Sequence, residues 1–166
     1  FFKAWLRDQF GNPWIIPEGA GDAFGTMGCQ GLITSEDLEH PWDAVVVSAG
    51  TGATAAGIAL GLRGLSHLFV GSALKGVDMG NLILERLDNA LMDSRWATEI
   101  MEEVTPWHDV HQGGFGKIPT KVEAFMDQFQ TETGIELDGV YTAKTMLKLQ
   151  AILQTPSAKR PEQFDR

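Results

Sequence analysis

Short apolar runs alternate along this sequence with longer stretches whose apolar residues recur at helical spacing. The runs Ala44–Val47 and His67–Val70 are typical of strands, and the first, which is apolar and largely β-branched, is predicted to be buried on both faces. Trp14–Pro17 is interpreted as a further short, buried strand. Because such runs alternate with helices of ten or more residues, the pattern predicts an α/β fold of three layers with a mainly parallel sheet.

The helical stretches have recognisable ends. Asp22 is predicted to cap one helix, and Gly134 to end another. The segment Trp96–Val104 fits a helix or a strand, and both interpretations stay open. We expect residues 1–153 to form a single α/β domain and the Pro-, Lys- and Arg-rich residues 154–166 to be a loose tail. The predicted helices are Phe1–Phe10, Ala23–Leu38, Ala55–Leu62, Asp78–Asp93, Pro119–Thr133 and Ala143–Leu153.

Composition narrows the classes of function. A chain of 166 residues with 43% hydrophobic and 21% charged residues is typical of a soluble globular protein. Its net charge of −9, with no cluster of Lys and Arg, argues against a nucleic-acid partner. The single cysteine, Cys29, has no partner for an internal disulfide, which predicts a reducing, cytoplasmic location; we interpret Cys29 as a small core residue. The sequence starts without Met inside a helical pattern, so we expect a piece of a longer protein.

The stretch from Ala44 to Leu62 predicts an anion site. A strand leads into the turn Ser48–Thr54, and a helix of small and aliphatic residues follows. Glycines let a ligand approach the backbone closely, the first-turn amides of the helix have no helical partner, and the helix dipole is positive at that end. Phosphate is the expected guest, although a tight turn without a ligand fits the same residues.

Two other interpretations of this stretch are disfavoured. It carries no charge and contains the pair Gly57 and Gly61, as a membrane span would, but its polar cluster lies at its centre. Gly50, Gly52 and Ala55 fit a dinucleotide-binding fingerprint, yet no acidic residue follows the next strand to bind a ribose.

Other candidate residues lie in the loops. The turns around Glu18 and Gly19, Ser48–Thr54 and Gly113–Gly116 are expected to converge at the carboxyl edge of the sheet, where α/β folds bind ligands. Tyr141, the single tyrosine, can shuttle a proton or position a carboxylate, or serve a structural role. Thr142 beside it is interpreted as a plain helix cap. The histidines and acid of His108, Asp109 and His111 lack a third metal ligand of clear standing, so no metal site is expected.

Four stretches together resemble the C-terminal half of one enzyme family. They are IPEG at 16–19 with Gly21 after it, VVVSAGTGATAAGIALGL at 45–62, GGFGKIP at 113–119 and TGIELDGVYTAKTM at 133–146. The family is that of the pyridoxal-phosphate enzymes D-cysteine desulfhydrase and 1-aminocyclopropane-1-carboxylate (ACC) deaminase, which have the tryptophan-synthase-β-like fold type (fold type II). The resemblance implies that this chain is part of their large domain, that the cofactor is pyridoxal 5′-phosphate, and that the full-length form is a homodimer acting on a small amino acid.

The resemblance also implies roles for individual residues. The loop Thr51, Gly52, Ala53 and Thr54, with Gly50 before it, matches the cup that holds the cofactor phosphate. Tyr141 matches the family's active-site tyrosine, and Phe115 lies in the motif beside the substrate. Thr142 lies where desulfhydrase-like members have Thr next to the pyridine nitrogen and deaminases tend to have Glu. A hydroxyl does not keep that nitrogen protonated as a carboxylate does, which favours the desulfhydrase-like branch.

Several positions depart from the family pattern. Phe115 replaces a common Tyr, Ala143 a common Gly, and Ala20 and Asp22 depart from a G-G-S-N pattern. The family's cofactor lysine belongs to an N-terminal region without a counterpart here, so we expect the chain alone to be inactive and its full-length parent to release ammonia and a 2-oxo acid. A non-catalytic module binding a phosphorylated ligand at Ser48–Thr54 is the alternative. No lysine of this chain has the expected context: Lys3, Lys75, Lys117, Lys121, Lys144, Lys148 or Lys159.

Overall fold

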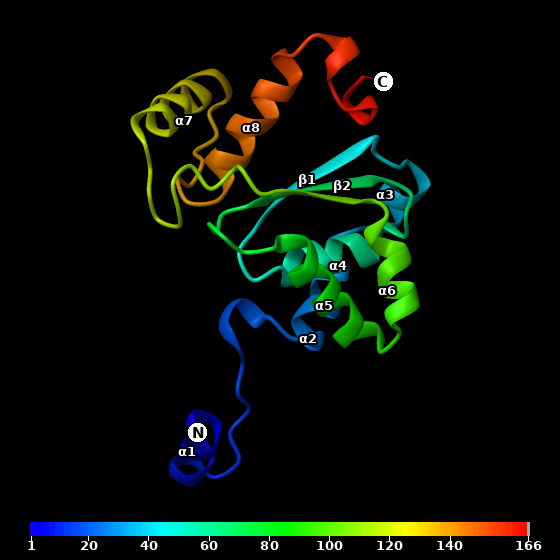
Figure 1. The fold of residues 1–166 in the computed structure, drawn as a ribbon, viewed down its shortest axis with the longest axis vertical. Coiled ribbons are helices and arrows are strands. Elements are labelled where there is room, and N and C mark those ends of the chain that lie inside the picture. Colours follow the sequence, from blue (N-terminus) through cyan, green and yellow to red (C-terminus); the bar gives the residue numbers. More distant parts are fainter. Residues whose placement is uncertain (166) are drawn as a thin grey trace.

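The computed structural model describes residues 1–165, in which helices cover both faces of a small parallel sheet (Figure 1). The strands β1 (Ala44–Ala49), β2 (His67–Ser72) and β3 (Val104–Trp107) lie side by side in that order. β1 pairs with β2 along its whole length, and β3 joins with Val104 opposite Leu68. The predicted three-layer α/β architecture with a parallel sheet is confirmed.

Helices connect the strands, as parallel pairing requires. The α-helices of residues 1–165 are α1 (Phe2–Phe10), α2 (Ala23–Gln30), α3 (Ser35–Glu39), α4 (Ala53–Leu62), α5 (Met79–Leu91), α6 (Ser94–Met101), α7 (Thr120–Thr133) and α8 (Thr142–Gln154). α4 lies between β1 and β2, α5 and α6 lie between β2 and β3, and α7 and α8 follow β3.

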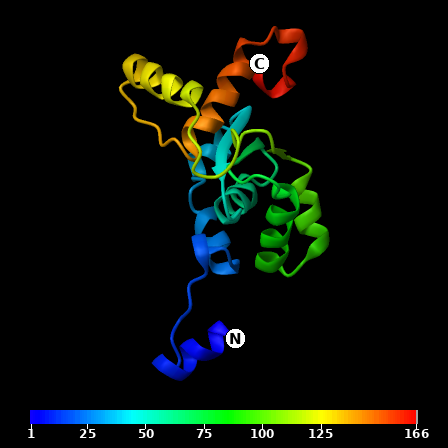
Figure 2. The ribbon, with the colours of Figure 1, turned by 60° about the vertical axis from the view of Figure 1, so that its left-hand side comes forward.

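Alternate side chains of the strands enter two separate hydrophobic cores. Val45 and Val47 pack on the side of α4, α5 and α6, whereas Val46 packs on the side of α8. α2 lies against the outer side of α4, and α7 lies against α8 (Figure 2). The sheet therefore has one large core beneath it and a smaller one above it.

α4 is almost completely enclosed. Each of its residues except Thr54 is buried, because small residues allow α2 to approach its backbone. A Cβ added to Gly57 would lie 2.4 Å from the carbonyl oxygen of Thr26 and 2.4 Å from the Cβ of Cys29. The predicted helix of small and aliphatic residues, tightly packed beside the sheet, is confirmed.

β1 is less buried than its sequence predicts. Its residues are half-buried except Ala49, whereas β2 is buried from Leu68 onward. The physical reason is position, because β1 forms the edge of the sheet in residues 1–165 and β2 its centre. The expectation that Ala44–Val47 is enclosed on both faces is therefore wrong for this chain.

Two further predictions about local structure are wrong. Trp14–Pro17 forms no strand, and the side chains of Trp14 and Ile16 are exposed, since no neighbouring strand in the described part of the chain pairs with them. The helix expected over Ala23–Leu38 is two helices. A capping box between Thr34 and Asp37 starts the second of them, α3.

The segment Trp96–Val104, which fits a helix or a strand by sequence, contains part of each. Trp96 lies in α6, and Val104 begins β3. Beyond α8, the residues expected to be loose contain 3-10 turns at Ser157–Lys159 and Glu162–Phe164. The ring of Phe164 lies 4.8 Å from that of Phe69, centroid to centroid.

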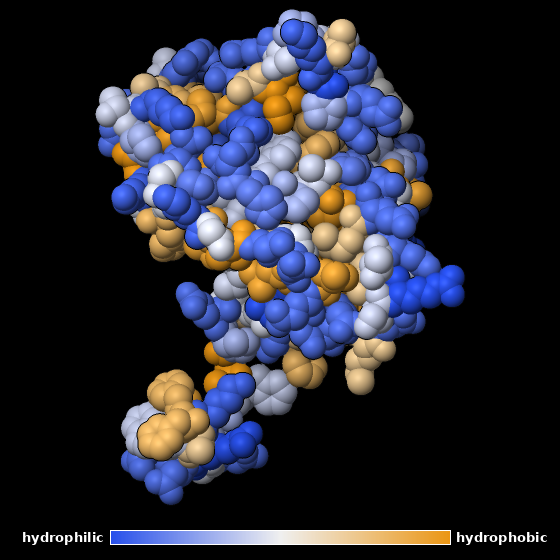
Figure 3. All heavy atoms as spheres, in the orientation of Figure 1, coloured by the Kyte–Doolittle hydropathy of each residue, from blue (hydrophilic) through white to orange (hydrophobic). Residues whose placement is uncertain are grey.

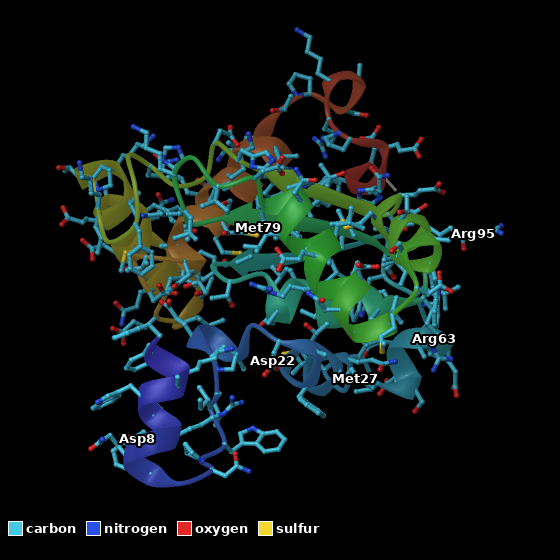
Figure 4. The ribbon with its side chains drawn as sticks, turned by 60° about the horizontal axis from the view of Figure 1, so that its bottom comes forward. Asp8, Asp22, Met27, Arg63, Met79 and Arg95 are labelled. Carbon is cyan, nitrogen blue, oxygen red and sulfur yellow. The ribbon has the colours of Figure 1, made fainter. Side chains whose placement is uncertain are left out.

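The predicted N-terminal helix is present as α1, which stands apart from the other elements (Figure 1). None of its residues is buried, and the rings of Phe2, Trp5 and Phe10 pack on one another. Figure 3 shows apolar side chains gathered on the surface of this arm. In Figure 4, α1, marked by Asp8, extends away from α2. Asp22 is the N-cap of α2, as predicted.

Candidate functional site

The turn between β1 and α4 has the features of an anion site. Gly52 is the N-cap of α4, with a left-handed backbone (φ 80°), and no side chain caps the helix. The amides of the first turn, from Ala53 onward, therefore lack both helical and side-chain acceptors. Gly52 and Ala53 are buried, whereas Thr54 is exposed on the first turn. The geometry leaves amide donors at the positive end of an enclosed helix.

Thr51 ties this turn to two other elements. Its hydroxyl donates to the carbonyl oxygen of Gly19 over 3.4 Å, and its own carbonyl accepts from Nε of Arg86 on α5 over 3.2 Å. Gly19 has φ of 58°, and a Cβ there would lie 2.6 Å from the Thr51 hydroxyl oxygen. The turn around Glu18 and Gly19 thus reaches the β1–α4 turn, as predicted, although no strand precedes it.

Cys29 lies beneath the same turn. Its thiol is 3.8 Å from the hydroxyl oxygen of Thr54, which is a weak hydrogen bond at most. The residue is half-buried, so the interpretation of Cys29 as a core residue is wrong; it fills the seam between α2 and α4.

Asp138 caps α8, whereas the sequence predicts Thr142 in this role. The Asp138 carboxylate accepts from the amides of Val140, Tyr141 and Thr142 over 2.7–2.9 Å. The Thr142 hydroxyl donates to that carboxylate over 2.6 Å and accepts from the Asp138 amide over 2.9 Å. Thr142 is thus a reciprocal partner of the capping carboxylate. An aspartate four residues before the first helical residue, followed by Gly139, is the signal that was missed.

The hydrogen bonds of Asp138 favour its ionised form. Partial burial raises the pKa of the Asp138 carboxyl, but the hydrogen bonds from Thr142, Tyr141 and Val140 outweigh it and hold that pKa below its ordinary value. The first turn of α8 therefore carries a permanent negative charge at neutral pH, and its amides are not free for another anion.

Tyr141 lies directly over the β1–α4 turn. A Cβ on Gly50 would be 3.2 Å from the tyrosine's hydroxyl oxygen, so the glycine makes room for the phenol. The ring of Phe115 meets that of Tyr141 edge to face, with centroids 5.8 Å apart and an interplanar angle of 71°. The backbone of Tyr141 is held by Thr145, whose hydroxyl donates to the Tyr141 carbonyl and accepts from Ser48 over 2.8 Å.

A cleft of about 340 Å³ opens beside these residues, between Val46–Ser48 of β1 and the start of α8, where Tyr141, Thr142, Thr145 and Met146 line it. The structure thus brings Gly50, Thr51, Tyr141, Thr142 and Phe115 to one edge of the sheet, as the sequence predicts.

The side chains of the histidine-containing loop make contacts within the chain. His111 accepts from the amide of Gly113 at its Nδ1 over 3.0 Å, and Asp109 pairs with Lys148 over 2.6 Å. Within residues 1–165, no group of three His, Cys, Asp or Glu side chains is arranged to hold a metal ion. In the same part of the chain, no helix is long and apolar enough to cross a bilayer.

Lys144 is a residue of the site that sequence reasoning passed over. It is fully buried in α8, and its Nζ donates to the carbonyl oxygens of His111 and Gly114 over 3.1 and 3.0 Å. Burial lowers the pKa of the Lys144 ammonium, while the charge of Asp138 acts in the opposite direction. Its spacing in α8 gives no sign of this, because a lysine one turn later, Lys148, is partly exposed.

Comparisons with known proteins agree with this architecture. No protein-family model matches the chain. A putative 1-aminocyclopropane-1-carboxylate deaminase of Pyrococcus horikoshii is 32% identical over 148 residues, covering 87% of this chain and 45% of the relative. A D-cysteine desulfhydrase of Klebsiella pneumoniae is 28% identical over 153 residues, covering 87% of this chain and 46% of the relative. The chain therefore spans about half the length of these relatives.

A solved structure has the same fold. It is a crystal structure described as an ACC deaminase homologue, with a TM-score of 0.68 and 25% sequence identity over 91% of this chain and 47% of that one. The fold and the resemblance noted in the sequence are therefore confirmed by independent comparisons.

Proposed function

Because the chain is homologous over most of its length to the ACC deaminase and D-cysteine desulfhydrase family, we propose that it is the C-terminal portion of a pyridoxal-phosphate-dependent lyase or deaminase. The full-length parent would act on a small amino acid and release ammonia and a 2-oxo acid. A cytoplasmic location and a homodimeric parent belong to the same proposal. One observation carries it: the uncapped turn of α4 lies directly beneath Tyr141.

The residues present fit the cofactor. Its phosphate would accept hydrogen bonds from the amides at Gly52–Thr54, since no side chain caps this end of α4. Gly50 and Thr51 complete the turn, and Tyr141 covers it. When bound, pyridoxal phosphate supplies an electron sink for the carbon that loses a bond.

The roles of the side chains follow from their positions. The Tyr141 hydroxyl is proposed to move a proton to or from the substrate, with Phe115 forming the apolar side of the substrate position. Thr142 would present a neutral oxygen to the cofactor ring, because its hydroxyl proton is directed at the Asp138 carboxylate. A hydroxyl leaves the ring nitrogen less protonated than a carboxylate would, which supports the desulfhydrase-like branch.

The chain alone is proposed to be inactive. Its fully buried lysine, Lys144, has its amine bound to two backbone carbonyls. The test is borohydride trapping of the purified chain with pyridoxal phosphate, followed by mass mapping of lysine peptides. We expect no adduct at one defined lysine, together with cofactor binding that inorganic phosphate competes away. A single specific adduct would show that the chain carries its own cofactor lysine, so the proposed reason for its inactivity would be wrong. Equal binding of unrelated phosphorylated compounds would instead favour a non-catalytic phosphate-binding module.

The proposed role of Tyr141 has its own test in the full-length parent. Tyr141→Phe removes only the hydroxyl, for which no protein hydrogen-bond partner is found in residues 1–165. We expect turnover to fall about 100-fold or more, the range of a lost proton-transfer group, with little change in the unfolding temperature. An unchanged turnover rate would remove Tyr141 from the mechanism.

A further inference from the structure

The loop that carries Phe115 has little structure of its own. Gln112, Gly113, Gly114 and Gly116 all have positive φ, at 51°, 101°, 141° and 72°. Its internal hydrogen bonds are limited to those from the Gly113 amide to Nδ1 of His111, from the Gly114 amide to the His111 carbonyl and from the Lys117 amide to the Gly114 carbonyl. A glycine-rich segment of this kind has many accessible backbone conformations, so a contact from outside is needed to hold it in one of them.

The loop is anchored at its flanks. Val110 is buried before it, and Ile118 packs on Gly139 after it, since a Cβ on that glycine would lie 2.6 Å from Ile118. Between these anchors, the ammonium of Lys144 reaches the carbonyl oxygens of both His111 and Gly114. Lys144 thus ties the interior of the loop to the first turn of α8.

Burying this ammonium has an energetic consequence. A charge removed from water is unfavourable unless hydrogen bonds replace its hydration. In the described part of the chain, no carboxylate lies within ion-pair distance of Lys144, so two carbonyls provide its hydrogen bonds. If the loop moved away, the ammonium would lose both carbonyl partners, and this loss opposes the movement.

We propose that Lys144 is a positioning residue that holds Phe115 against Tyr141. Lys144 follows Tyr141 by three residues, so the same helical turn carries the tyrosine and the group that fixes the loop opposite it. The contact itself is independent of any cofactor. The further inference that Lys144 sets the width of the substrate position rests on the proposed function. Lys144 acts through Phe115 and does not touch the reacting atoms.

The test uses Tyr141 as its own reporter. It is the only tyrosine, so a chain labelled with carbon-13 tyrosine gives one set of ring resonances, which the ring current of Phe115 shifts. Phe115→Leu supplies the reference for loss of that ring. Lys144→Met removes the ammonium at similar side-chain length, and Lys148→Met, one turn later, removes the exposed ion pair with Asp109 near the same loop.

We expect Lys144→Met to move the Tyr141 resonances in the direction that Phe115→Leu does, and at least half as far, while Lys148→Met leaves them in place. A folded Lys144→Met chain with wild-type resonances would overturn the proposal, as would an equal shift in Lys148→Met or no shift in Phe115→Leu. None of these outcomes depends on cofactor binding or turnover. Failure of the proposed function would instead appear in the trapping experiment.

A second measurement covers the case in which Lys144→Met does not fold, which far-UV circular dichroism would reveal. In the wild-type chain labelled with nitrogen-15 lysine, the protons of the Lys144 ammonium should exchange with water about tenfold more slowly than those of Lys148, because the first is buried and doubly bonded. Equal exchange rates would show that the contact is not maintained, and the proposal would fall.

Discussion

Two helices, α4 and α8, begin at the same edge of the sheet, yet their first turns are satisfied in opposite ways. Both have first-turn amides without helical acceptors and a positive dipole end. In α4, Gly52 precedes the helix and no side chain caps it. In α8, Asp138 accepts from the amides of Val140, Tyr141 and Thr142. The helix dipole is therefore common to both helices, and the absence of a built-in carboxylate is what favours α4 as the proposed anion site.

The two helices also differ in burial and in what they contribute to the candidate site. α4 consists largely of small residues, is buried except at Thr54, and contributes backbone to the site. α8 has only Ala143, Lys144 and Thr145 buried, and contributes side chains that face the cleft or hold the loop around Phe115. We therefore propose that α4 is the backbone platform for an anion and that α8 orients the groups that would act on a substrate.

The largest effect is expected where the enclosure of α4 is broken. Gly57→Ala places a Cβ 2.4 Å from both the Thr26 carbonyl oxygen and the Cys29 Cβ, and backbone cannot yield as a flexible side chain can. We expect the free energy of unfolding of the chain to fall by about 3 kcal/mol, at the upper end of overpacking effects. Urea denaturation followed by tryptophan fluorescence measures it.

Gly28→Ala is the matched control on the facing helix. A Cβ on Gly28 meets no atom within 4 Å, so the alanine gains helix propensity and should raise the free energy of unfolding by about 0.5–1 kcal/mol. If both variants changed stability alike, close packing of α2 on α4 would not be what encloses the platform.

The capping carboxylate of α8 is expected to have the next largest effect. Asp138→Ala leaves three amides and the Thr142 hydroxyl without their acceptor and should lower the free energy of unfolding by about 2 kcal/mol. Because the pKa of Asp138 in the folded chain lies below the ordinary 3.8, its stabilisation is complete above about pH 4. It is lost as the pH falls through the folded pKa.

The pH dependence distinguishes capping from a mere contact. Urea denaturation at a series of pH values between 5 and roughly 2 should show a steeper loss of stability in the wild-type chain than in Asp138→Ala. Asp138→Asn keeps one carbonyl acceptor and should retain part of the stability without its pH dependence. Parallel curves for wild type and Asp138→Ala would show that the carboxylate does not stabilise α8.

Much of the platform could be predicted from the sequence because its signals are local. The apolar run before Ser48, the glycines at 50 and 52 and the small residues of α4 each limit the backbone to a few conformations. The position of Gly50 follows from one rule, that parallel strands end at the same edge, whereas Tyr141 follows α7 and no strand precedes it in residues 134–141. These predictions needed no knowledge of which side chains meet.

What the sequence could not predict depends on tertiary contacts. Lys144 and Lys148 lie one turn apart, and only the path of the loop after β3 decides which of them is buried. Trp14 and Ile16 have the apolar character of a strand but no neighbour to pair with in residues 1–165. The cap of α8 was assigned to Thr142 because the competing acceptor, Asp138, lies outside the helix.

The smallest effect is expected from giving α4 a carboxylate at its first turn, as α8 already has. This change tests the contrast between the two helices most directly. Thr54→Asp places a carboxylate on the exposed position of the first turn, where it can accept from the free amides and repel another anion. We expect affinity for inorganic phosphate and for pyridoxal phosphate to fall about tenfold, or about 1.4 kcal/mol, without loss of stability. Titration followed by the amide resonances of residues 52–55 measures both ligands.

Thr54→Asn separates charge from size in this experiment, since its amide has the shape of the carboxylate without the negative charge. Its affinity should stay within about threefold of wild type if electrostatic repulsion is the cause. Equal losses in the two variants would mean that Thr54 acts by filling space. Unchanged affinity in Thr54→Asp would place the anion away from α4. The difference between the uncapped start of α4 and the start of α8, capped by Asp138, would then explain nothing about ligand binding.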